Sequence, residues 1–209
     1  NMKKLLILLL FCPMIGLSQQ GLTIVDSLIH NGVSRSYILY IPASYTSNVA
    51  SPLVFNFHGL TSDANSQMWY GDFRGIADTA NFIIVHPQGL LNNLGQTHWN
   101  VGQSAGIDDV GFTETLLDFL STQYNINLDR VYSTGMSNGG YMSYHLACTL
   151  NDKIAAIASV TGAMSQYTQI ICNPVHPTPV LEIHGTADAI VSFNTILSGL
   201  QYWYNYNNC

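Results

Sequence analysis

Charged residues are scarce in this sequence. Asp, Glu, Lys and Arg make up 9 % of its 209 residues, and six Lys and Arg stand against twelve Asp and Glu. Nucleic acids are bound mainly by basic side chains that contact the phosphates, so the acidic balance argues against a nucleic-acid partner. A neutral, polar surface suits a protein that acts on uncharged material, although a surface that merely avoids charge gives the same composition.

Long apolar runs are lacking as well. The run from Leu5 to Leu17 is shorter than the roughly 20 residues that a membrane-spanning helix needs, and Pro13 interrupts it. Lys3 and Lys4 precede the run, and small residues stand at its end. This layout predicts a secretory signal peptide over residues 1–18. We therefore expect an extracellular or periplasmic protein without a stable membrane anchor.

Internal repeats, low-complexity tracts and interdomain linkers are absent, which leaves one domain, expected over residues 19–209. Two alternating segments around the Asn31-Gly32 turn predict an antiparallel hairpin. Nearly continuous apolar runs, typical of strands buried on both faces, then alternate with segments of helical spacing. The predicted strands are 22–30, 34–42, 52–59, 82–89, 129–135, 154–162 and 179–185, and the predicted helices are 66–80, 108–124, 138–150 and 193–204. This order predicts an α/β fold whose mostly parallel sheet carries helices on both faces.

The pattern G-x-S-x-G, which can mark a nucleophilic serine on a sharp turn between a strand and a helix, occurs twice. Around Ser137 it lies between the strand-like segment RVYST and a segment of helical spacing, with glycines where close packing is required. Around Ser104 it follows THWNV, which is too short and polar for a central strand. The context favours Ser137 as the nucleophile, and a plain serine at a glycine-rich helix start is the alternative.

A serine hydroxyl is a weak nucleophile at neutral pH, so a histidine has to take its proton and a carboxylate has to orient that histidine. In parallel-sheet hydrolases the acid and then the histidine follow the serine along the chain. Asp188 comes just after the strand 179–185, where such an acid belongs, although a helix-capping role is the alternative. Glu182 is a poorer candidate because it lies within that strand.

No histidine follows Asp188. The seven histidines are His30, His58, His86, His98, His145, His176 and His184. The chain also stops before the closing strand and helix that this topology needs. We therefore expect that the catalytic base, that strand and that helix belong to a missing C-terminal part.

Two backbone N–H groups are expected to bind the oxyanion that forms during acyl transfer. One belongs to Asn138, directly after the serine. The other is expected in the loop FHGLTSDA after the first parallel strand, at Leu60 or Thr61, with Leu60 preferred. A plain tight turn is the alternative for this loop.

Together, these segments resemble a family of secreted α/β-hydrolase esterases related to poly(3-hydroxybutyrate) depolymerases and feruloyl or acetyl-xylan esterases. The resemblance runs from about Ser36 to Cys209 through FHGLTSDA, HPQG, WN, DDVGF, RVYSTGMSNGG, LAC and IHGTADAIVSF, in family order. It implies the α/β-hydrolase fold, Ser137 as nucleophile, Asp188 as triad acid, and a histidine in a later glycine-rich segment. Trp99 of the WN element resembles a residue that contacts substrate, and a packed loop tryptophan is the alternative.

The same resemblance implies a serine carboxylester hydrolase that requires no metal or cofactor and acts on feruloyl or acetyl esters of plant polysaccharides. A depolymerase of poly(3-hydroxybutyrate) is the runner-up. The lack of a histidine after Asp188 keeps open a non-catalytic binding module on a hydrolase scaffold. Asp108 and Asp109 resemble a structural pair of the family, which we interpret as a helix cap.

Cysteines are few, and Cys148, Cys172 and Cys209 remain after the predicted signal peptide. The helix after Ser137 runs away from the carboxyl edge of the sheet and brings Cys148 to the opposite edge. The chain between the next two parallel strands has to return to that same edge, which brings Cys172 there. We predict a Cys148–Cys172 disulfide, which leaves Cys209 for another partner; a pairing that involves Cys209 is the alternative.

Overall fold

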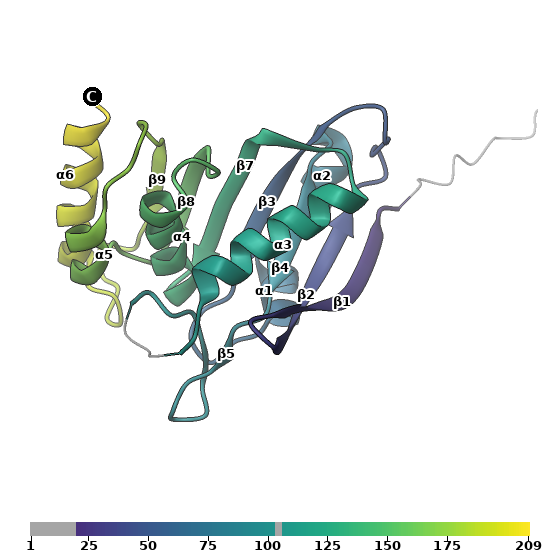
Figure 1. The fold of residues 1–209 in the computed structure, drawn as a ribbon. Coiled ribbons are helices and arrows are strands. Elements are labelled where there is room, and N and C mark those ends of the chain that lie inside the picture. Colours follow the sequence, from purple (N-terminus) through teal and green to yellow (C-terminus); the bar gives the residue numbers. More distant parts are fainter. Residues whose placement is uncertain (1–19, 103–105) are drawn as a thin grey trace, which may run out of the picture.

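The computed structural model describes residues 20–102 and 106–209, so the predicted signal peptide and Ser104 lie outside the described residues. A seven-stranded sheet has the order β1-β2-β4-β3-β7-β8-β9 (Figure 1). Its strands are β1 (Leu22–His30), β2 (Val33–Ile41), β4 (Ile83–Pro87), β3 (Ser51–Phe57), β7 (Ile126–Met136), β8 (Ala156–Val160) and β9 (Val180–Ile183). The pairs β1–β2 and β2–β4 are antiparallel, and the other neighbours are parallel. The predicted hairpin and the mostly parallel sheet are confirmed.

The helices that connect these strands are α1 (Ala64–Tyr70), α2 (Arg74–Ala80), α3 (Asp109–Gln123), α4 (Asn138–Thr149), α5 (Gln166–Ile171) and α6 (Ile196–Tyr206), with a 3-10 turn η1 (Phe193–Thr195) before α6. The single helix predicted over 66–80 is wrong, because the segment forms two helices that break at Gly71. The carbonyl of Gly71 accepts a hydrogen bond of 3.1 Å from the side chain of Asn56, so a sheet residue occupies this acceptor at the end of α1. Helix α5 and a small hairpin of β5 (Leu90–Leu91) and β6 (Thr97–His98) have no counterpart in the prediction.

Alternate side chains of β2 point to opposite faces of the sheet and meet different helices. Leu39 belongs to the main core together with Phe112 of α3. Its neighbour Ile38 lies in a second cluster with Met68 of α1. Each such buried side chain contributes about 1.5–3 kcal/mol relative to exposure, so both helical layers stabilise the sheet. The predicted arrangement with helices on both faces is therefore confirmed.

One part of the sheet presents apolar side chains to an open hollow of about 530 Å³. The hollow lies between α2 and the strands β7, β8 and β9, and its lining includes Phe73, Ile76 and Leu181. Leu181 is 55 % exposed. The parallel sheet is thus less well covered around β9 than around β2.

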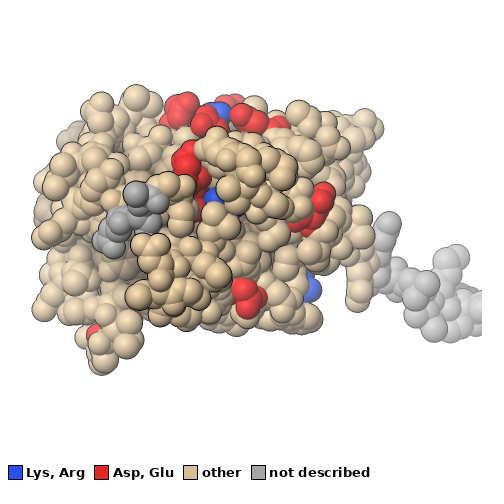
Figure 2. All heavy atoms as spheres, turned by 60° about the horizontal axis from the view of Figure 1, so that its bottom comes forward, with Lys and Arg blue, Asp and Glu red and all other residues tan. Residues whose placement is uncertain are grey.

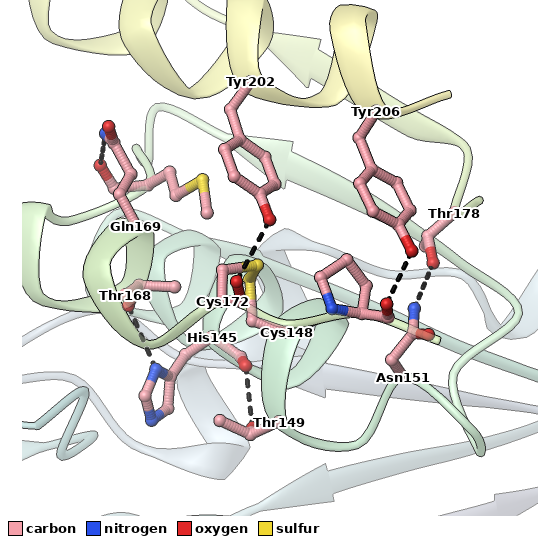
Figure 3. The surroundings of a disulfide bond; sticks show 12 residues. His145, Cys148, Thr149, Asn151, Thr168, Gln169, Cys172, Thr178, Tyr202 and Tyr206 are labelled. Carbon is pink, nitrogen blue, oxygen red and sulfur yellow. Dashed lines mark hydrogen bonds between the residues drawn. A yellow bond between two sulfur atoms is a disulfide. The ribbon is translucent and has the colours of Figure 1, made fainter. Parts of the chain in front are cut away.

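The predicted disulfide between Cys148 and Cys172 is confirmed (Figure 3). It joins the end of α4 to the residue that follows α5, with 4.7 Å between the two Cα atoms. The hydroxyl of Tyr202 on α6 donates to the carbonyl of Cys172 at 3.2 Å, so the cross-linked segment is also held by the last helix. Cys209 is exposed and free.

Candidate active site

Ser137 occupies a strained turn between β7 and α4. Its backbone has φ 52° and ψ −116°, a conformation that residues with a side chain rarely adopt. Such strain costs on the order of 1–3 kcal/mol and persists only where the surroundings enforce it. Here the Ser137 amide donates to the carbonyl of Val160 on β8 at 2.8 Å, and its carbonyl accepts from Tyr141 at 3.0 Å. The turn therefore has the geometry of a nucleophile elbow, as the glycine pattern predicts.

The glycines around Ser137 permit a backbone contact that no other residue would allow. A Cβ atom at Gly139 would overlap the carbonyl oxygen of Phe57, and one at Gly135 would lie 2.6 Å from the same oxygen. Helix α4 consequently starts directly against the end of β3. This contact brings the residues after Ser137 next to the loop that follows β3.

The peptide between Gly59 and Leu60 is oriented by the ring of His58. The Gly89 amide donates to His58 Nε2 at 2.9 Å, so the proton of the neutral ring is on Nδ1, which donates to the Gly59 carbonyl at 2.7 Å. Burial lowers the pKa of His58 and favours this neutral form. In a trans peptide the carbonyl and the next N–H point in opposite directions, so the Leu60 N–H is turned away from the imidazole.

Hydrogen bonding distinguishes the two candidate oxyanion donors of this loop, the amides of Leu60 and Thr61. The Thr61 amide donates to the carbonyl of Thr97 at 2.8 Å and is therefore occupied. Among the described residues, no acceptor binds the amide of Leu60. Asn138 is the first residue of α4, where amides have no acceptor within the helix. Leu60 and Asn138 are thus available as a donor pair, and their role as the oxyanion hole remains a prediction.

Hydrogen bonds between Trp99 and Asn138 hold the loop of Trp99 against the start of α4. The Trp99 amide donates to Asn138 Oδ1 at 2.6 Å, and Asn138 Nδ2 donates to the Trp99 carbonyl at 3.1 Å. The indole N–H donates to the His58 carbonyl at 2.9 Å, and the residue is 1 % exposed. Trp99 is therefore a packed residue that connects the two loops of the site, and its predicted contact with substrate is not tested.

Asp108 and Asp109 have different roles. Asp108 is the N-cap of α3 and accepts from the Gly111 amide at 2.8 Å, as predicted. Asp109 forms a buried ion pair with Arg35 of β2 and accepts from the Asn100 amide at 2.6 Å. The interpretation of both residues as a cap is wrong for Asp109, because its carboxylate instead anchors the segment that carries Trp99.

Asp188 lies in the loop after β9. Its Oδ1 accepts from the amides of Ile190 and Val191 at 2.8 and 2.9 Å, and these bonds lower the pKa of its carboxyl. The ring of His184 lies 3.7 Å from Oδ2. Asp188 is therefore an ionised carboxylate in a structured loop two strands from the elbow, and its role as triad acid remains a prediction.

No histidine is hydrogen-bonded to Ser137 within the described residues. His58, His86 and His145 are buried in the body of the fold, and burial lowers the pKa of each. His184 is engaged by Glu182 and Val191. The described residues thus include the Ser137 turn and the Asp188 carboxylate, without a histidine hydrogen-bonded to Ser137.

A pocket of about 510 Å³ opens beside Ser137. Its described lining residues are Leu60, Asn92, Gln96, His98, Trp99, Asn100, Val101, Ser137, Asn138, Tyr141 and Ser165. None of them is Asp, Glu, Lys or Arg. Figure 2 shows that charged atoms are sparse on the side of the molecule to which the β5–β6 hairpin belongs. The pocket is suited to an uncharged molecule with hydrogen-bonding groups.

No group of His, Cys, Asp and Glu that could hold a metal ion occurs within residues 20–102 and 106–209. Over the same ranges, none of the helices has the length and apolar character needed to cross a bilayer.

The parallel sheet and the strained serine turn define an α/β-hydrolase. The family model for phospholipases and carboxylesterases, Abhydrolase_2, matches residues 45–208, and the chain belongs to this family.

The chain is similar to a bifunctional acetylxylan esterase/xylanase of Neocallimastix patriciarum, with 29 % identity over 90 % of this chain and 26 % of that protein. It is also 31 % identical to feruloyl esterase B of Piromyces equi over 78 % of this chain and 31 % of that protein. The chain thus spans less than a third of the length of these two relatives.

Solved structures share the fold. An acetyl xylan esterase from Aspergillus awamori superposes with a TM-score of 0.73 at 15 % identity, covering 88 % of this chain and 80 % of that one. A ferulic acid esterase from Anaeromyces mucronatus superposes with a TM-score of 0.63 at 16 % identity, covering 90 % and 80 %.

Two parts of the site were not predicted from the sequence: the side-chain amide of Asn138 and the β5–β6 hairpin. His58 stands at a strand end, where the sequence predicts a structural histidine bonded to backbone, and its bonds to the Gly59 carbonyl and the Gly89 amide confirm this prediction. A local signal was available only for the hairpin, where the turn residues Asn92 and Gly95 lie between Leu90-Leu91 and Thr97-His98.

Proposed function

We propose that this chain provides the nucleophile and oxyanion-binding part of a serine carboxylester hydrolase. The observation that carries the proposal is the conformation of Ser137 at the end of β7, next to the start of α4 and to the amide of Leu60, which has no acceptor among the described residues. Ser137 attacks the ester carbonyl, and the amides of Leu60 and Asn138 stabilise the oxyanion. The alcohol leaves, and water then releases the acyl group from Ser137.

The general base of this reaction is a histidine oriented by Asp188. In parallel-sheet hydrolases this histidine follows the acid along the chain, and all seven histidines of this sequence precede Asp188, so the proposal requires a further histidine. A protein without it would be a non-catalytic binding module. This alternative is decided by whether the product of the complete reading frame hydrolyses esters at all.

The proposed substrates are feruloyl or acetyl esters of plant polysaccharides. The names of the relatives, which are feruloyl and acetylxylan esterases, support this choice over poly(3-hydroxybutyrate). The uncharged pocket beside Ser137 is compatible with it. Turnover of methyl ferulate, acetylated xylan and a hydroxybutyrate polymer by the product of the complete reading frame separates the candidates.

The test of the reaction compares two serines in matched sequence patterns. Ser137→Ala should reduce p-nitrophenyl acetate hydrolysis at least about 1,000-fold, because the nucleophile is lost. Ser104→Ala changes the second G-x-S-x-G pattern and should leave turnover nearly intact. Equal losses in the two variants would overturn the assignment of the elbow.

We also propose that the protein is secreted, with residues 1–18 as signal peptide and 19–209 as part of the catalytic domain. The disulfide between Cys148 and Cys172 supports this proposal, because such bonds persist in oxidising compartments. The exported protein should begin near Gln19. N-terminal sequencing checks this, and an intact Lys3-Lys4 segment in the exported protein would contradict it.

A further inference from the structure

Behind Asp188 lies a buried pair of titratable residues that the proposed reaction does not use. Glu182 and His184 are two positions apart at the end of β9, so their side chains point to the same face. The side chains are 3 % and 1 % exposed. His184 Nδ1 lies 3.1 Å from Glu182 Oε1, and Tyr144 of α4 donates to Glu182 Oε2 at 3.0 Å.

The contacts of His184 fix the position of its protons. Its Nε2 lies 2.7 Å from the carbonyl of Val191, which only accepts, so Nε2 carries a hydrogen. Nδ1 faces Glu182. Either the ring is doubly protonated beside a carboxylate or the carboxyl is protonated beside a neutral ring. In both forms one proton lies between His184 and Glu182.

The same contacts close the loop that contains Asp188. His184 holds the Val191 carbonyl at the end of the loop. The amides of Ile190 and Val191 in turn bind Asp188 Oδ1. The orientation of the Asp188 carboxylate thus depends on a residue that His184 fixes in place.

We propose that His184 is a positioning residue, which together with Glu182 retains one shared proton and thereby holds the loop that presents Asp188. This inference rests on the proposed function for the catalytic role of Asp188. The clamp is defined as the contact between Glu182 and His184 together with the contact between His184 and Val191. It is a property of this chain whether or not Asp188 is catalytic.

Electrostatics favours retention of the proton. Burial by itself lowers the pKa of His184, but the bonds to the Val191 carbonyl and to Glu182 outweigh burial and raise it. Burial raises the pKa of Glu182. The other titratable groups that face the pair are Asp188 of the loop and, on α4, Tyr144 and Tyr141.

Tyr144 and Tyr141 add no charge beside the pair, because burial raises the pKa of both hydroxyl groups. Phe193 packs edge-on against the His184 ring. Loss of the shared proton at alkaline pH would leave the Glu182 carboxylate facing the lone pair of Nδ1. The clamp should then open and release the Asp188 loop.

The first test uses the product of the complete reading frame and needs no activity. Nitrogen-15 NMR of the His184 ring should show a protonated Nε2 at neutral pH. Amide hydrogen exchange should show that the protection factors of Ile190 and Val191 fall about tenfold in His184→Ala and, for the unaltered chain, at alkaline pH. In Glu182→Gln an amide N–H replaces the shared proton, so the protection should no longer depend on pH.

The amide of Tyr141, which is bonded to Ser137, serves as the folding control for each variant. Should His184→Ala fail to fold, His184→Gln and Glu182→Gln provide the same comparison. Unchanged protection of Ile190 and Val191 in folded His184 variants would overturn the clamp. An alkaline loss that persists in Glu182→Gln would overturn the shared proton.

The second test measures p-nitrophenyl acetate hydrolysis by the product of the complete reading frame. His184→Ala should lower kcat about tenfold with little change in KM, because Asp188 orients the base and does not bind substrate. Glu182→Gln should abolish the alkaline fall of kcat. Ser137-dependent turnover with an unchanged kcat in His184→Ala would reject the positioning role while the proposed function stands. If no turnover depends on Ser137, the proposed function fails, and the exchange experiment alone decides the clamp.

Discussion

Asn138 and Trp99 are joined by two reciprocal hydrogen bonds between the Asn138 side-chain amide and the Trp99 backbone. The residue that follows Ser137 thus holds the neighbouring loop with its side chain, while its backbone N–H, at the start of α4, is available to the proposed oxyanion. We predict that Asn138→Ala lowers kcat for p-nitrophenyl acetate about 10- to 100-fold, because the donor stays but its position relaxes. The exposed Asn65→Ala is the control, and equal rates in the two variants would contradict the prediction.

The disulfide between Cys148 and Cys172 should contribute substantially to stability. It closes a loop with a sequence separation of 24, for which the chain-entropy model gives about 3 kcal/mol. The double replacement Cys148→Ser/Cys172→Ser should lower the free energy of unfolding in urea by roughly this amount. Cys209→Ser, at an exposed free thiol, should change it by less than about 0.5 kcal/mol. A double variant as stable as the Cys209 control would show that the bond is dispensable.

The close contact between α4 and β3 makes Gly139 irreplaceable. Gly139→Ala places a methyl group on the Phe57 carbonyl and should destabilise the fold by at least about 2 kcal/mol. Gly75 lies within α2 and has open space around it, so Gly75→Ala should stabilise by about 0.5–1 kcal/mol. Thermal unfolding should show a lower melting temperature for Gly139→Ala and a higher one for Gly75→Ala. A Gly139→Ala protein that melts at the original temperature would refute the contact.

Buried neutral histidines should make the fold sensitive to acid. Burial lowers the pKa of His86 and of His145 to about 4 from an ordinary 6.5. For groups whose pKa is depressed by folding, the stabilisation is complete above the unfolded pKa and is lost as the pH falls through the folded one. The free energy of unfolding should therefore decrease between pH 6.5 and 4, by at most about 3 kcal/mol for each histidine. Urea titrations across this range should show a smaller slope for His145→Gln, and an identical slope would disprove the contribution of that residue.

Local patterns were sufficient to predict the sheet and the elbow. The strand preceding Ser137, the glycines around it and the helical spacing after it all indicate the same turn, and the structure has that turn. The path of the chain was also sufficient for the disulfide, because parallel strands fix which edge each connection reaches. These predictions depend on residues that are close in sequence or on topological rules.

Features that depend on contacts distant in sequence were not predictable. Asp109 has the sequence context of a helix cap, and only the fold brings Arg35 of β2 to its carboxylate. The helix boundary at Gly71 depends on the side chain of Asn56 in the sheet. The role of Glu182 beside His184 likewise emerges only where the end of β9 meets α4. In each case the contacting residue is brought into place by the packing of the sheet against its helices.

Covalent labelling is the most direct test of the proposal that Ser137 is an activated nucleophile. The product of the complete reading frame is treated with a fluorophosphonate, which phosphonylates activated serines, and its peptides are examined by mass spectrometry. We predict one adduct, on the peptide that contains Ser137, and no labelling of Ser137→Ala. An adduct on Ser104, or labelling that persists in Ser137→Ala, would contradict the claim.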